Sequence, residues 1–280
     1  MYRAFLPGFR LLRGSEAYLS SNLAGQLLPP PSASVIQYGY FRDGYSPDAS
    51  GVAAFGSFLF PTLGRFLLPL VALLVLVVTG DADGSILVAA VLSLTITTAA
   101  CVVGWFFLRR ESAARWLGAK AQRPLSWILV KRKRQPIDDG PQRASTLRTQ
   151  ALVVLREGWK LGSAGVAANL FVTYVILLAS LRFVGVSSVQ LSGADAFAAF
   201  AVAFWAGAVL PVTGSGLGVV DVVLITMLIE SSSASDDALV AAALLWRVFY
   251  SVLILPLGAV TLSRFRNAGA PAGDAPVLRS

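Results

Sequence analysis

Apolar runs about as long as a bilayer is thick recur along this chain, and they restrict its fold more than any other feature. A helix needs about 20 consecutive apolar residues to cross the hydrocarbon core. Hydrophobic residues make up 56% of the 280 residues and charged residues 14%, whereas a soluble domain carries about 25% charged residues. The helices expected to cross the membrane cover residues 55–78, 85–108, 161–183 and 238–262.

Two further apolar segments are too short or too interrupted to cross on their own. One covers 15–28, and the other extends from about 194 to 229 with a turn inside it. With these segments the sequence predicts an all-α polytopic membrane protein of about five to seven transmembrane or re-entrant helices.

The positive charge is concentrated in the loop 109–160, which predicts the orientation of the chain. The net charge is +8, and an excess of arginine and lysine beside membrane helices marks the cytoplasmic side. Tryptophan and leucine alternate with the basic residues, a pattern typical of amphipathic helices at a membrane surface. We therefore expect this loop and the C-terminus to be cytoplasmic. The run Lys131–Arg134 is interpreted as a topology signal and as an attraction to anionic lipids, and no nucleic-acid partner is expected.

The segment Pro211–Asp221 places Pro211, Gly214, Gly216 and Gly218 before an acid, inside otherwise apolar sequence. Irregular backbone survives at membrane depth only where protein or trapped water satisfies its polar groups. The arm that follows, 219–229, is about 17 Å long as a helix, too short for a core of about 30 Å. Two alternatives remain: a re-entrant hairpin, or a broken helix whose turn lies below the midplane.

Charges inside the apolar segments mark a candidate site. Asp221 and Arg247 both lie about 14 Å from the outer loop that joins their helices, so they are candidates for an ion pair. A structural pair and direct contact with an anionic substrate or a coupling ion are both consistent with this placement. Arg65 lies roughly 20 Å from the outer end of its helix, and it is a second candidate for either snorkelling or function.

A weak internal repeat relates the two ends of the chain. Residues 24–32 resemble 206–214, and in each copy a small pair and a leucine precede proline, Pro29 in the first copy and Pro211 in the second. Matching broken segments in two halves are the best sequence indication of a transporter's midplane site. Pro29 is therefore a secondary candidate.

The residue inventory argues against catalysis and against metals. The chain has no histidine and one cysteine, Cys101, which lies in an apolar run. Acid–base chemistry at Asp221 would lack a second proton-transfer group. We therefore expect no catalytic residues, no metal site and no cofactor.

These features together resemble the flippase-like transmembrane domain of the lysylphosphatidylglycerol synthase family, which includes the membrane half of the multiple peptide resistance factor. The resemblance rests on Leu210-Pro211 with the Gly-rich run 214–221, on the arginine-plus-aromatic stretch 245–250, and on 27–29 before 38–44. It extends from about Tyr2 to Arg266. Asp221 stands where the family tends to have glutamate, residues 30–33 replace a Gly-rich loop, and the family's first two spans and its soluble aminoacyl-transfer domain are missing.

The resemblance implies a flippase-like domain over 1–266, followed by a disordered cytoplasmic tail, 267–280. The expected function is translocation, or assistance in translocation, of an anionic, aminoacylated or glycan-linked lipid. Arginine-rich, alanine-rich composition favours a bacterial source, and hence the inner membrane. Membrane lipids are the expected partners. The alternative hypothesis is an accessory or scaffold subunit of a membrane glycosyltransferase or lipid synthase, with loop 109–160 as its docking surface. Nothing in the sequence indicates an oligomeric state.

Overall fold

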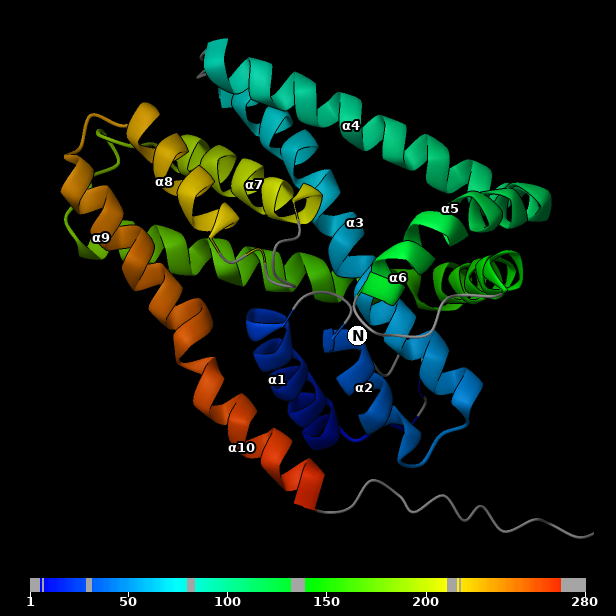
Figure 1. The fold of residues 1–280 in the computed structure, drawn as a ribbon. Helices are drawn as coiled ribbons and strands as arrows, with labels where there is room; N and C mark the ends of the chain where they lie inside the picture. The colour runs from blue at the N-terminus through cyan, green and yellow to red at the C-terminus, as the bar shows by residue number, and fades with distance from the viewer. Residues whose placement is uncertain are drawn as a thin grey trace, which may run out of the picture.

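The computed structural model describes residues 6, 8–28, 32–79, 84–131, 139–210, 216 and 218–267, and all regular structure in these ranges is helical (Figure 1). The helices are α1 (Leu11–Leu27), α2 (Ser32–Arg42), α3 (Pro47–Thr79), α4 (Gly84–Arg109), α5 (Glu111–Lys131), α6 (Gly140–Phe183), α7 (Gly193–Val209), α8 (Val219–Glu230), α9 (Asp236–Arg247) and α10 (Ile254–Asn267), with a π-helical turn, Val248–Val252, between the last two.

The protein is an all-α membrane protein, as the sequence predicts. Three helical stretches are long and apolar enough to cross a bilayer: 49–79, 158–183 and 236–265. Shorter apolar stretches cover Leu94–Arg109 and Gly193–Val209. One face of α3 exposes an aliphatic stripe at helical spacing, Leu67, Val71, Leu74 and Val78. A contiguous apolar surface of this kind suits contact with lipid chains better than contact with water.

The internal repeat corresponds to two structural units of the same design. In each unit a helix of 17 residues, α1 or α7, ends at a leucine, Leu28 or Leu210, whose backbone N–H bonds to the carbonyl of Ala24 or Ala206. A second short helix follows, α2 or α8. A long apolar stretch comes next, which is α3 in the first unit and α9 with the π turn and α10 in the second. The units also interlock, because α1 packs on α10 while α7 packs on α3 (Figure 1).

Small residues make these contacts close. A Cβ at Gly258 of α10 would lie 2.6 Å from the Leu19 carbonyl oxygen of α1, and one at Gly207 of α7 would lie 2.5 Å from the Val220 side chain of α8. Lipid chains are as apolar as helix side chains, so no hydrophobic effect drives helices together within a membrane. Close approach of the helix backbones therefore supplies much of the packing energy. The main core gathers around α7, where Phe200 and the small faces of the helix are buried against α3, α6, α8 and α9.

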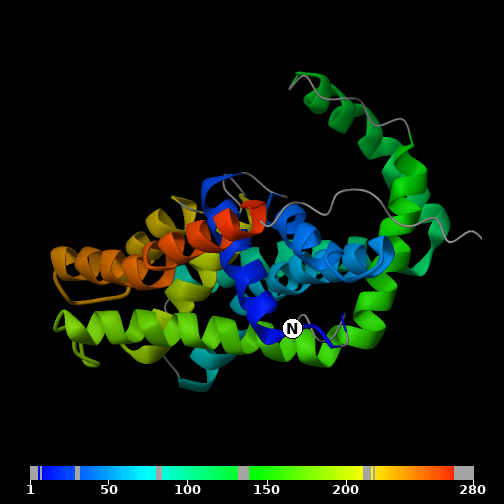
Figure 2. The ribbon, with the colours of Figure 1, turned by 90° about the horizontal axis from the view of Figure 1, so that it is seen from below.

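The basic loop is a helical hairpin that stands away from the bundle. It is formed by α5 and the first part of α6, with Gly118 and Gly140 in backbone contact (Figure 2). The third span expected over 161–183 is confirmed as the apolar part of α6, 158–183. One helix of 44 residues, α6, carries both parts, because the change from polar to apolar residues near 160 marks a surface boundary and breaks no backbone hydrogen bond.

The last expected span, 238–262, is confirmed within the apolar stretch 236–265, and its helix contains a π turn. Its hydrogen bonding widens at the π turn, where the Leu253 N–H reaches the Val248 carbonyl five residues back. Pro256 follows in the next turn and has no N–H to donate to the carbonyl of Val252, the last residue of the π turn. The missing donor explains why the regular i to i−4 hydrogen bonding is interrupted here. The buried residues along this stretch are Trp246, Ser251 and Gly258. The π turn adds one residue to a helical turn, and the buried face of the helix continues past it.

Candidate functional site

Asp221 lies in the first turn of α8, and its carboxylate closes that end of the helix. Gly218, the residue before the helix, has φ +89°, and its N–H donates to Asp221 Oδ2 at 3.0 Å. The carboxylate therefore satisfies one of the free donors at the positive end of the helix dipole. Gly216 has φ +73°, and a Cβ there would meet Gly207 Cα at 3.0 Å. Only glycine fits this position, because both the conformation and the space exclude a side chain.

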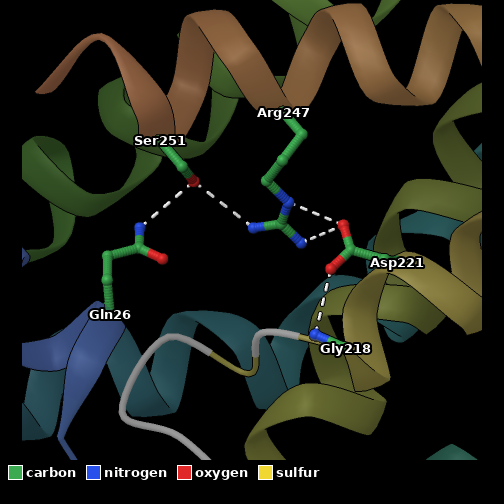
Figure 3. Close-up of polar contacts among 5 residues, drawn as sticks. All are labelled: Gln26, Gly218, Asp221, Arg247 and Ser251. Carbon is green, nitrogen blue, oxygen red and sulfur yellow. Dashed lines mark hydrogen bonds and ion pairs between the residues drawn. The ribbon is translucent and has the colours of Figure 1, made fainter. Parts of the chain in front are cut away.

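Arg247 comes from the facing helix and pairs with the same carboxylate, which confirms the predicted ion pair (Figure 3). Its Nε donates to Asp221 Oδ1 at 2.6 Å, and its Nη2 contacts the same oxygen. The exposed fractions are 12% for the Arg247 side chain and 30% for that of Asp221. The carboxylate is therefore the more accessible partner, and the guanidinium is the one whose desolvation must be offset.

A second polar contact ties this pair to the other structural unit. Arg247 Nη1 donates to Ser251 Oγ at 3.3 Å, and Gln26 Nε2 of α1 donates to the same hydroxyl at 3.1 Å (Figure 3). The sequence reasoning missed both Gln26 and Ser251. The internal repeat could have indicated Gln26. This glutamine, in the first copy, corresponds to Ala208 in the second, so a polar side chain stands where the other copy has a small apolar one, and the glutamine is buried.

Arg65 contacts an aromatic cluster formed by Phe204, Trp246 and Tyr250. The Arg65 guanidinium is 5.7 Å from the centre of the Phe204 ring, and the Arg247 guanidinium is 5.0 Å from that of Trp246. Between them, Phe204 contacts Trp246 and Tyr250 edge to face, each with ring centres 6.1 Å apart. The two arginines therefore contact different rings of one aromatic cluster.

Of the predicted site residues, the structure brings together Gly216, Gly218, Asp221 and Arg247. Pro29, Pro211 and Gly214 lie outside the described residues. Within the part of the chain that the structure describes, no cluster of three or more histidine, cysteine, aspartate or glutamate residues could hold a metal ion.

The site is a charge pair that a competing anion could open. A phosphate bound in place of the Asp221 carboxylate would contact the N-terminus of α8 and the Arg247 guanidinium. Proteins commonly present these two kinds of group to phosphate. The same contacts also suit a purely structural pair, since each charge offsets the other's desolvation.

No family model, no curated protein and no solved structure matches this chain. The resemblance to the lysylphosphatidylglycerol synthase family is therefore carried only by the motifs quoted above.

Proposed function

We propose that this protein translocates, or assists the translocation of, an anionic, aminoacylated or glycan-linked lipid across a bacterial inner membrane. The observation that carries this proposal is the Asp221–Arg247 pair, held at the start of α8 inside an apolar bundle. Ionisable residues at membrane depth are costly, and they commonly mark substrate pathways. The hairpin of α5 and α6 would then lie at the cytoplasmic surface, where its basic residues attract anionic lipids.

In this mechanism Asp221 is an internal anion that a lipid phosphate replaces. A phosphate entering the site accepts hydrogen bonds from the Arg247 guanidinium and from the start of α8, while Asp221, the more exposed partner, moves toward water. When the headgroup leaves, Asp221 binds Arg247 again, so the guanidinium is never left without an anion. No bond is made or broken, and the protein acts by electrostatic exchange.

Reconstitution into liposomes tests this function. We expect the wild type to move fluorescently labelled anionic phospholipid or polyprenyl phosphate between leaflets, and Asp221→Ala and Arg247→Ala to slow this movement at least about tenfold, because each leaves an unpaired charge. Asp43→Ala is a matched control, since it breaks the exposed Arg13–Asp43 pair elsewhere in the fold. Lipid movement unchanged in both site variants, with the proteins folded, would refute the proposed site.

One observation favours a second candidate function, that of a scaffold for a membrane glycosyltransferase or lipid synthase. The hairpin of α5 and α6 projects from the bundle and presents a helical surface (Figure 2). An inactive wild type in liposomes, together with specific binding of such an enzyme that is lost when α5 is deleted, would favour this candidate.

A further inference from the structure

A cavity separate from the ion pair opens between α1, α3 and α6. Its volume is about 530 Å³, within the range of about 300–1,000 Å³ typical of ligand sites. Its wall carries an apolar part, from residues such as Leu19, Val166 and Leu170, and a polar part. The polar lining residues are Arg10, Ser15, Tyr18, Arg65, Asn169 and Tyr250. Two arginines and no acid are among the described lining residues, so the cavity attracts anions.

Arg65 is the most unusual group in this wall. It is half-buried in α3, about 21 Å along the helix from Thr79, and its guanidinium lies on the face of Phe204. No carboxylate of the described residues lies within ion-pair distance of it, unlike Arg247, which has Asp221. A cation at this depth that faces a cavity is stabilised by an anion more than by any other ligand.

The rest of the wall suits the remainder of an amphiphile. Tyr18 and Asn169, from α1 and α6, meet there with the amide nitrogen 3.4 Å from the phenol oxygen, which adds polar groups from two helices beside the charge. The aliphatic side chains and Phe204 offer apolar surface next to these polar groups. A soluble anion would use only the polar part, whereas a lipid with a charged headgroup would use both.

We propose that this cavity binds an anionic amphiphile, with its phosphate on Arg65 and Arg10 and its hydrocarbon along the apolar wall. The cavity is next to the proposed translocation site, because its lining residue Tyr250 stacks on Trp246 with ring centres 5.4 Å apart, and Arg247 lies on that same Trp246. Its role as the place where substrate waits rests on the proposed function. The binding itself does not.

Binding of short-chain lipids to the purified full-length protein, measured by native mass spectrometry, tests this site. We expect phosphatidylglycerol to bind more tightly than phosphatidylcholine, and glycerol phosphate to compete weakly because it lacks the hydrocarbon. Arg65→Gln should weaken phosphatidylglycerol binding at least about tenfold, the effect of losing one charge-assisted hydrogen bond, and Arg65→Lys should weaken it less. Arg42→Gln, which removes the same charge from the last turn of α2, outside the cavity lining, should have no effect.

Two further variants keep the test decisive. Ser15→Trp places a large side chain into the cavity from an exposed position on α1, so it should block binding even if Arg65→Gln fails to fold. Asp43→Ala, which breaks the exposed Arg13–Asp43 pair and removes no lining residue of the cavity, should leave binding intact. Binding unaffected by both Arg65→Gln and Ser15→Trp, or equal binding of phosphatidylcholine, would overturn the assignment. Lipid binding that depends on Arg65, without lipid movement in liposomes, would keep it and reject the proposed function.

Discussion

The strength of the Asp221–Arg247 pair can be measured by a double-mutant cycle of Asp221→Asn, Arg247→Gln and the double variant. Unit charges about 4 Å apart interact by about 4 kcal/mol at an effective dielectric constant near 20. The Asp221 side chain is 30% exposed, so water screens part of this interaction, and we expect a coupling free energy of about 2 kcal/mol. Asp221→Asn should be the more destabilising single change, by about 3 kcal/mol, because it leaves the more buried charge unpaired.

The assay is unfolding in mixed detergent micelles, followed by intrinsic tryptophan fluorescence. The double variant should be more stable than the sum of the single effects predicts, because it leaves no charge without a partner. Coupling of less than about 0.5 kcal/mol, the range in which independent sites add, would show that the two charges do not stabilise each other.

Three other experiments test the packing and the topology. Gly258→Val should destabilise the protein by about 2–3 kcal/mol, because the new side chain overpacks against the α1 backbone. Gly104→Ala should not destabilise it, since no atom lies within 4 Å of the added Cβ. Equal thermal stability of the two variants would contradict the close α1–α10 contact. Gln26→Leu should cost about 1 kcal/mol and slow lipid movement, by removing the bond to Ser251; an unchanged unfolding midpoint would count against that link. The orientation can be tested by labelling single cysteines with a membrane-impermeant maleimide, in a Cys101→Ser background. The reagent should reach Ser112→Cys from the cytoplasm and Ser233→Cys from outside. Labelling of both positions from one side would reject the proposed orientation.

The sequence predicted the ion pair because the rise of a helix converts position into depth. Asp221 and Arg247 are each about nine residues from the same outer loop, and no other information was needed to bring them together. The same reasoning placed Arg65 deep in its helix, but it could not show the cavity, since that space is lined by residues from α1, α3, α6, α7 and the π turn.

The contacts that the sequence did not predict depend on long-range packing or on a single local fault. Gln26 and Ser251 are 225 residues apart, and only the packing of α1 on α10 joins them. The π turn has a local cause in Pro256, which the hydropathy of a long apolar stretch conceals. The repeat was visible as a short match around Pro29 and Pro211, yet the interlocking of its two units is a property of the folded bundle.

The most direct measurement of whether the pair works on lipid, or only holds two helices together, is the lipid translocation rate of the neutral double variant, Asp221→Asn with Arg247→Gln. This variant leaves no unpaired charge, so a purely structural pair is replaced with little loss of fold. We expect the variant to fold, to bind phosphatidylglycerol in the Arg65 cavity, and to move labelled lipid at least about tenfold more slowly than the wild type, because no guanidinium remains to receive the phosphate. Translocation within about twofold of the wild-type rate would contradict the proposed exchange and leave the pair with a structural role.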